Sequence, residues 1–174
     1  MRVLVRPPLE SDREELLRAM KASRELHEPW ISNVTTDEYF DGLLARVDDD
    51  RYDANLVRLL EGGAIVGVIN LSEIVRGAFQ SAFLSYAAVA GYEGQGLISE
   101  GLQLVLERAF TDLELHRIEA NIQPGNEPSR TLVRRAGFVY EGTSRSYLKL
   151  GGVWRDHEHW VLLAEEWHAS DGRA

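Results

Sequence analysis

Apolar positions in the first fifty residues repeat with helical spacing after a short extended start. Residues 3–6 alternate and stop at two prolines, which lack amide donors, so they predict a short strand. A capping pattern at residues 11–14 precedes an amphipathic helix that should end before Pro29. A second capping pattern at residues 35–38 predicts another helix, which should end before the acidic run 48–50.

The pattern then changes from helical to extended. Two β-rich runs, 56–61 and 64–74, flank Gly62-Gly63, and this glycine pair is typical of a two-residue hairpin turn. A third run, 79–89, follows the turn expected at Arg76-Gly77. We therefore expect three adjacent antiparallel strands.

The remaining part of the chain alternates between helical and extended patterns. Residues 97–109 carry a wide apolar face and predict a helix that packs on the sheet. The run 116–122 predicts a strand parallel to the one before this helix, because a helical crossover joins them. A short helix over 127–135 should end at Gly137, where glycine suits a left-handed residue. Two final strands are expected at 139–147 and 153–162.

Together these elements predict one mixed α/β (α+β) domain over residues 1–168, followed by a polar tail over 169–174. We expect a central, mixed but mostly antiparallel, twisted sheet of about seven strands flanked by about four helices. A chain of 174 residues is long enough to bury a sizeable core.

Composition narrows the classes of partner. The chain has 19 Lys and Arg against 28 Asp and Glu, and this net charge of −9 disfavours nucleic acid or an anionic membrane as the main partner. It has no cysteine, which excludes disulfides and thiolate chemistry, and no histidine pair at helical metal-ligand spacing, so we expect no metal. No run approaches a membrane span and no signal peptide is evident, so we expect a cytoplasmic protein.

The segment Gly94-Gln95-Gly96 stands between an expected strand and an expected helix. Closely spaced glycines let the backbone approach a ligand, and the free amides of a helix N-terminus favour an anion such as pyrophosphate. Taken alone, the pattern also suits an ordinary turn. No Gly-Lys-Ser or Gly-Lys-Thr follows it, which disfavours a P-loop NTPase.

Four segments, in order along nearly the whole chain, carry a family resemblance. They are residues 26–30 (Leu-His-Glu-Pro-Trp), the hairpin 70–79, the loop 94–98 with Glu100, and a final set at 116–118, 120–121, Pro124, Asn126, Ser129, Leu132, 137–138, 141–142 and 154–157. In these motifs the chain resembles the GCN5-related N-acetyltransferase superfamily, and within it the RimJ/RimL type, which acetylates the N-terminal alanine of ribosomal proteins.

Two positions depart from the family pattern. Glu93 stands where the superfamily loop usually has Gln or Arg, and we expect this carboxylate to stay away from bound phosphates. Val133 stands where many relatives have the tyrosine that protonates the leaving sulfur, so that role must move to another group or be absent.

The resemblance implies acetyl-CoA as the acetyl donor. It places the pantetheine arm beside the expected strand end and near Asn126, and it places Ser129 near the sulfur as a proton donor. Asn126 also suits the N-cap of the helix at 127–135, and Ser129 could equally be a helix-surface residue. The implied cofactor contacts are Ala87, Ala88, Val89, Gly94, Gln95, Gly96, Leu97, Ile98, Asn126 and Ser129.

The general base is open at this stage. An α-amino group has a pKa of about 7.7–8.0, so only a modest base is needed. Among polar strand residues, Glu119 is preferred to Glu73 because of its strand, and a water relay would also suffice. By family analogy the acceptor site lies between the first two helices and the last hairpin, with Glu28, Trp30, Asn70 and Asn121 as substrate contacts.

The favoured function is acetyl-CoA-dependent transfer to a protein N-terminus, ribosomal proteins included, by direct attack in a ternary complex. Two alternatives stay open. One is the same chemistry on a small amine, such as an antibiotic or polyamine, and the other is a non-catalytic acyl-CoA-binding module. We expect a monomer or homodimer.

Overall fold

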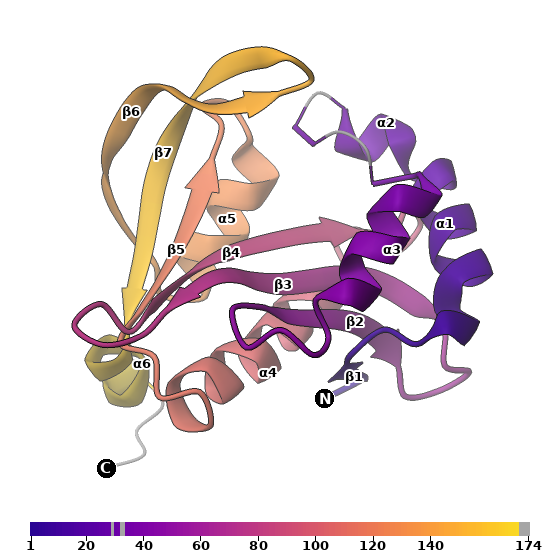
Figure 1. Cartoon of the computed structure of the whole chain (residues 1–174), viewed down its shortest axis with the longest axis horizontal. Coiled ribbons are helices and arrows are strands. Elements are labelled where there is room, and N and C mark those ends of the chain that lie inside the picture. The colour runs from indigo at the N-terminus through magenta and orange to yellow at the C-terminus, as the bar shows by residue number, and fades with distance from the viewer. Residues whose placement is uncertain (29, 32–33, 171–174) are drawn as a thin grey trace.

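One seven-stranded sheet organises the molecule, with the strand order β1-β2-β3-β4-β5-β7-β6 (Figure 1). The computed structural model describes residues 1–28, 30–31 and 34–170. Neighbouring strands are antiparallel except β4 and β5, which are parallel, and this confirms the expected mixed sheet. The strands are β1 Val3–Arg6, β2 Asp53–Leu59, β3 Ile65–Val75, β4 Ser81–Ala88, β5 Arg117–Ile122, β6 Val139–Leu150 and β7 Val153–Leu163.

The described residues form six α-helices where about four were expected. Two of them, α1 and α2, replace one expected helix because Ser23 interrupts it. The Ser23 hydroxyl donates to the Ala19 carbonyl at 2.7 Å and accepts from the Ala90 amide at 2.8 Å. The helices are α1 Arg13–Ala22, α2 Arg24–His27, α3 Asp37–Ala45, α4 Leu97–Thr111, α5 Glu127–Arg135 and α6 Ala164–Ser170, and a 3-10 turn, Glu10–Asp12, precedes α1.

The last helix, α6, was not expected. It places Trp167 5% exposed against Phe110 of α4, with ring centroids 6.1 Å apart. Over residues 164–168 Trp167 is the one buried side chain, so this segment has no apolar repeat from which the helix could be predicted. The expected boundary at residue 168 falls inside this helix, while Pro29 and residues 171–174 lie outside the described part of the chain.

The start of α1 also differs from the expected capping box. Asp12 is the N-cap residue, but its side chain makes no capping bond. Its carboxylate instead accepts two hydrogen bonds from Arg6, each 2.7 Å, and one from Arg58 at 2.7 Å. Burial opposes the charge, yet these partners and the Leu9 amide hold the pKa of Asp12 below its usual range. These partly buried ion pairs join the 3-10 turn before α1 to β1 and β2.

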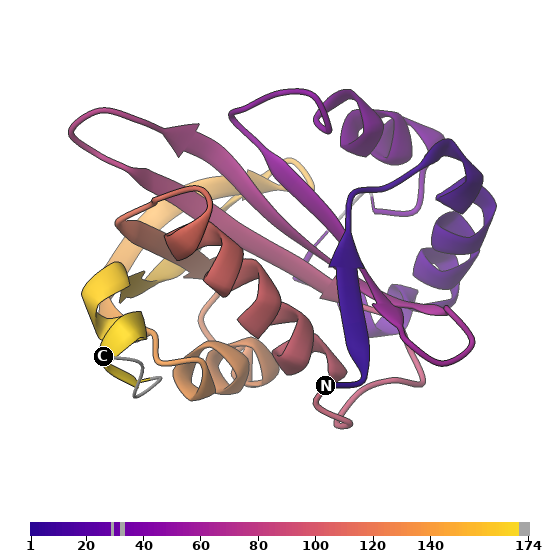
Figure 2. The ribbon, with the colours of Figure 1, turned by 90° about the horizontal axis from the view of Figure 1, so that it is seen from below.

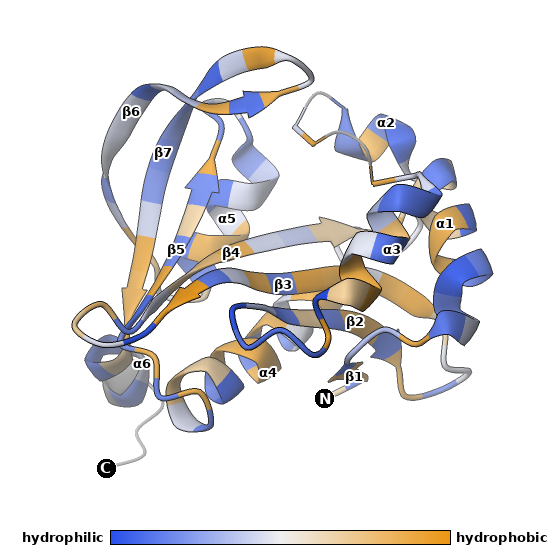
Figure 3. Ribbon diagram, viewed as in Figure 1, coloured by the Kyte–Doolittle hydropathy of each residue, from blue (hydrophilic) through white to orange (hydrophobic). Residues whose placement is uncertain are grey.

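Helices cover both faces of the sheet (Figure 2). The helices α4, α5 and α6 lie over one face, and α1 to α3 lie over the other. Two apolar cores result, one that contains Leu102, Leu106 and Ile118, and one that contains Leu16, Phe40 and Val68. Figure 3 shows hydrophobic residues along much of β3 and hydrophilic residues over much of α1, as expected for a sheet covered by an amphipathic helix.

The sheet opens between β4 and β5. Their pairing ends at Leu84 and Ala120, although β4 continues to Ala88 and β5 to Ile122. In Figure 1, β4 runs across the view while β5 turns upward, away from it. The opening leaves the end of β4 without a strand neighbour on that side, and it separates the loop before α4 from the start of α5.

Candidate active site

The loop between β4 and α4 contains three glycines with left-handed backbone conformations. Gly91, Gly94 and Gly96 have φ angles of 91°, 69° and 78°, a region that L side chains rarely adopt. Gly96 is the N-cap of α4, and no side chain caps the first turn. The amides that begin the helix at Leu97 are therefore available to an anion, and the helix dipole favours one there.

The first residues of the chain contribute a cation to this loop. The Arg2 guanidinium donates to the Gln95 carbonyl at 2.7 Å and to Oε1 of Glu100 at 2.7 Å. The backbone amide and guanidinium of Arg2 hold the pKa of Glu100 below its usual range. Sequence reasoning missed Arg2 because 93 residues separate it from Gln95, and no local pattern reports such a contact.

Two side chains of the loop fold back on its own backbone. The Glu93 carboxylate accepts from the Gly91 amide at 2.5 Å, and the Gln95 side-chain amide donates to the Gly91 carbonyl at 2.9 Å. Both side chains therefore bond to Gly91, at the beginning of the loop, while Gly94 and Gly96 carry no side chain at all.

Near its end, β4 directs two backbone amides toward the opening, while the Val89 amide faces β3. The Val89 amide donates to the Val66 carbonyl of β3 at 2.9 Å, so it is already used. Because successive backbone groups of a strand point to opposite sides, the amides of Tyr86 and Ala88 point toward β5 instead. The Ala88 carbonyl accepts from Nε2 of His27 at 2.8 Å, which ties α2 to this strand end.

The first turn of α5 lies across the opening from β4. Asn126 is its N-cap, and its side chain accepts from the Ser129 amide at 3.2 Å, which confirms the expected cap. The Tyr86 hydroxyl donates to the Ser129 carbonyl at 3.4 Å, and burial raises the pKa of Tyr86 to about 12. Ser129 is half-buried beside this contact. The helix and the strand thus bring Ser129 close to the open end of β4.

The expected acceptor contacts gather on the opposite face of the sheet from α4 and α5. The register pairs Asn70 with Ser85, and Phe83 with Glu119, so Asn70, Ser85, Glu119 and Asn121 share one face. Of the remaining two, Trp30 borders this region because its carbonyl accepts from the Gln123 side chain at 2.8 Å. Glu28 is instead an exposed residue with a distant ion pair to Arg24, 3.9 Å.

Four buried side-chain atoms lack a hydrogen-bond partner within residues 1–28, 30–31 and 34–170, and one of them belongs to an expected acceptor contact. It is Oδ1 of Asn121, near the end of β5. A buried polar atom without a hydrogen bond is costly, and a donor group of a ligand would satisfy it. Asn121 therefore marks a place where an N–H group could bind.

Glu119 belongs to a connected polar array. Its Oε2 accepts from Nη2 of Arg117 at 2.8 Å, and its Oε1 lies 3.0 Å from Nδ1 of His159. The other ring nitrogen of His159 lies 2.8 Å from Oγ of Ser144. These contacts join His159 of β7 to β5 and β6 through strand pairing, which no local sequence pattern shows.

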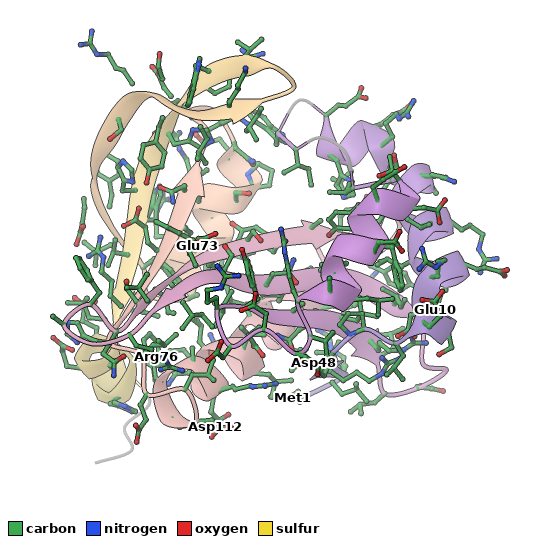
Figure 4. The ribbon with its side chains drawn as sticks, in the orientation of Figure 1. Met1, Glu10, Asp48, Glu73, Arg76 and Asp112 are labelled. Atoms are coloured by element: carbon green, nitrogen blue, oxygen red, sulfur yellow. The ribbon has the colours of Figure 1, made fainter. Side chains whose placement is uncertain are left out.

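Glu73, the other carboxylate considered as a base, is labelled in Figure 4 and belongs to β3. It sits at an irregularity of β3 with a φ of 50°, and it accepts from the Tyr52 hydroxyl at 3.1 Å. Its exposed position near the β3–β4 turn removes it from the opening between β4 and β5.

The comparisons with known proteins assign the chain to a family. A family model described as an acetyltransferase (GNAT) domain matches residues 2–139. The chain therefore belongs to the GNAT acetyltransferase family, and the expected family and fold are confirmed.

Several relatives are similar over most of the chain. The protein named "Probable N-acetyltransferase YjcK" of Bacillus subtilis is 33% identical over 171 residues, which cover 92% of this chain and 93% of that one. The ribosomal protein uS5-alanine N-acetyltransferase of Escherichia coli is 38% identical over 103 residues, 59% of this chain and 53% of that one. The structure of Mycobacterium smegmatis RimJ in complex with CoA-disulfide is 30% identical, with a TM-score of 0.85. The match covers 98% of this chain and 90% of that one.

A further solved structure shares the fold alone. Spermidine N-acetyltransferase from Vibrio cholerae, in complex with CoA and spermine, has a TM-score of 0.80 at 19% identity. The match covers 95% of this chain and 98% of that one. In the described part of the chain, no helix combines the length and apolar character that crossing a membrane requires.

Proposed function

We propose that the protein transfers acetyl from acetyl-CoA to the α-amino group of a protein N-terminus, with ribosomal proteins among its substrates. The observation that carries the acetyl-CoA part is the sheet opening between β4 and β5, with the uncapped N-terminus of α4 at one end. The names and identities of the uS5-alanine N-acetyltransferase and of RimJ support the protein N-terminus as acceptor. The proposal places the reaction in the cytoplasm.

The cofactor contacts follow from the free backbone groups. The amides from Gly94 to Ile98 receive the pyrophosphate, and Arg2 adds positive charge beside them. The exposed edge of β4 over residues 86–88 pairs with the pantetheine arm as a strand would. Asn126 and Ser129 line the same path from α5. In this arrangement Val89 contributes packing only, because its amide is bonded to Val66.

Acetyl-CoA supplies an activated thioester when it is bound, and the protein supplies donors and a base. The amine attacks the thioester carbonyl directly, so an N–C bond forms while the C–S bond breaks. The Ala88 amide donates to the carbonyl oxygen as that oxygen gains negative charge. The Ser129 hydroxyl gives a proton to the departing sulfur, the role that Val133 cannot perform.

Substrate choice tests the proposal. The protein is incubated with acetyl-CoA and peptides that differ only in their first residue, and with spermidine and an aminoglycoside, while thiol release and product mass are measured. We expect turnover with Ala and Ser N-termini. The control is the same peptide with a blocked N-terminus and an internal lysine, which should give no product.

Each alternative has its own signature. Turnover confined to the small amines would replace the protein acceptor with a small-molecule acceptor. Binding of acetyl-CoA without turnover on any amine would identify a non-catalytic acyl-CoA module. Neither result is compatible with a protein N-terminal acetyltransferase.

A further inference from the structure

Three strands bring together a carboxylate, an imidazole and a hydroxyl at hydrogen-bonding distance. Glu119 comes from β5, His159 from β7 and Ser144 from β6. The ring of His159 lies between the other two, 3.0 Å from the carboxylate and 2.8 Å from the hydroxyl. The His159 side chain is 17% exposed and the Glu119 side chain 15%, so the array is largely shielded from water.

Glu119 is poorly placed to accept a proton from a substrate. One of its oxygens accepts from Arg117 at 2.8 Å and the other faces Nδ1 of His159. Both carboxylate oxygens of Glu119 are therefore engaged by side chains of the protein. Its geometry suits the orientation of an imidazole better than direct contact with an amine.

The carboxylate decides which nitrogen of His159 carries the proton. Nδ1 faces an acceptor without hydrogens, so it is the donor nitrogen of the neutral ring. Nε2 is then the acceptor nitrogen, and it receives the hydrogen bond of the Ser144 hydroxyl. Tyr147 packs edge-on against the ring, with centroids 4.7 Å apart, and limits its rotation.

The array adjoins the face where the acceptor contacts gather. His159 pairs directly with Asn121 across β5 and β7, so both side chains point to the same side of the sheet. Asn121 carries the buried oxygen that lacks a donor. An amine bound to that oxygen would lie beside the histidine array and not on the α4 side of the sheet.

The charged neighbours of His159 come from all three strands. On β5 they are Glu119 and Arg117, on β6 Glu141, which bonds to Arg117 at 2.7 Å, and on β7 His157. Burial lowers the pKa of His157, so its ring is neutral near pH 7. Arg117 hydrogen-bonds to both Glu119 and Glu141. An imidazolium at position 159 would therefore face a net negative surrounding.

We propose that His159, through Ser144, is the proton acceptor of the acetyl transfer, with Glu119 as the positioning residue. This inference rests on the proposed function. As the N–C bond forms, a proton of the attacking amine moves to Oγ of Ser144, and the hydroxyl proton of Ser144 moves to Nε2 of His159. Glu119 then stabilises the imidazolium, and the proton returns to solvent after the product leaves.

Two substitutions should move the pH dependence of kcat in opposite directions. With His159→Gln the internal base is lost, so kcat at pH 7 should fall on the order of 10²-fold. The acidic limb of the plot of kcat against pH should move to higher pH, toward the amine pKa of about 7.7–8.0. With Glu119→Gln the imidazolium loses its counter-charge, so the acidic limb should move downward while kcat falls. A purely structural role would move neither limb.

His168→Gln is the matched control, because His168 is exposed on α6 and should leave the profile unchanged. Thermal midpoints of all variants establish whether they fold. If His159→Gln does not fold, Glu119→Gln still tests whether the acidic limb of the pH profile moves to lower pH. Unchanged limbs in folded variants would overturn the inference. Acetylated Ser144, found by mass after incubation with acetyl-CoA alone, would also overturn it, because Ser144 would then be a nucleophile.

Failure of this inference can be told apart from failure of the proposed function. The wild-type protein with Ala-peptide and with small amines decides the acceptor class first. The pH profiles are then measured with whichever amine turns over. A small-amine enzyme with shifted limbs would refute only the protein acceptor.

Discussion

Ser129 is the residue proposed to donate the proton that a tyrosine donates in many relatives. Val133 occupies the usual tyrosine position and is fully buried. The half-buried Ser129 lies one turn closer to the N-terminus of α5, where the Tyr86 hydroxyl reaches its carbonyl. A hydroxyl at this position can donate to a sulfur at the open end of β4, whereas a buried valine cannot.

Removal of the Ser129 hydroxyl should slow the chemical step. We expect Ser129→Ala to lower kcat on the order of 10²-fold, the usual contribution of a general acid, with the KM for acetyl-CoA nearly unchanged. The measurement is kcat and the KM for acetyl-CoA at saturating peptide. Thr131→Ala is the control because it removes a hydroxyl roughly 200° around the same helix. An equal loss of kcat and cofactor affinity would remove Ser129 from the acid role.

At the scale of elements, two glycines allow α4 to pack closely against the sheet. A Cβ on Gly101 would lie 2.8 Å from Cγ1 of Val57 in β2, and a Cβ on Gly67 would lie 2.3 Å from Cδ1 of Ile98. Both approaches are closer than van der Waals contact allows. The glycines let α4 sit deep on β2 and β3, and this seat fixes the loop from which the helix begins.

A larger residue at this contact between α4 and the sheet should lower the free energy of unfolding, while substitution of a glycine away from the contact should not. Gly101→Val should reduce the free energy of unfolding by about 1–3 kcal/mol or more, because the added methyls overpack the contact with Val57. Gly42→Ala is the contrast, since a Cβ on this α3 residue meets nothing within 4 Å. It should stabilise by roughly 0.5–1 kcal/mol. Urea unfolding measures both, and a neutral Gly101→Val would contradict the close seat.

For the whole molecule, the parallel pair β4 and β5 decides where ligands can bind. The two strands separate beyond Leu84 and Ala120, and this leaves a gap between the α4 and α5 N-termini. In the proposed function, the donor enters from the face covered by these helices, and the expected acceptor contacts lie on the other face. In this arrangement the opening is the place where donor and acceptor meet.

Cofactor binding should therefore stabilise the entire fold. At a CoA concentration of 100 times Kd, the free energy of unfolding should rise by about 2.7 kcal/mol. Gly96→Glu should abolish this stabilisation, because a side chain and a negative charge enter the loop at a left-handed residue. Gly62→Glu is the matched control at a φ of 75° in the distant β2–β3 hairpin. A normal thermal shift of Gly96→Glu with CoA would mean that the loop does not bind phosphate.

Much of the fold was predictable because its signals are local. The helix expected at 127–135 matches α5 residue for residue, since an Asn cap and a left-handed glycine bound it. The Gly62-Gly63 hairpin and the parallel crossover were confirmed for the same reason. The break at Ser23 and the helix α6 were missed, because long-range contacts with Ala90 and Phe110 create them.

The sequence by itself determined most of the elements, the family resemblance and the position of the glycine loop, because periodicity, caps and turn residues act over a few positions. Only the tertiary structure decided which distant groups share a site. Arg2 meets Gln95, and Ser144 meets His159 and Glu119, through strand register and the seating of α4. A sheet register is a property of paired strands, so no single segment contains it.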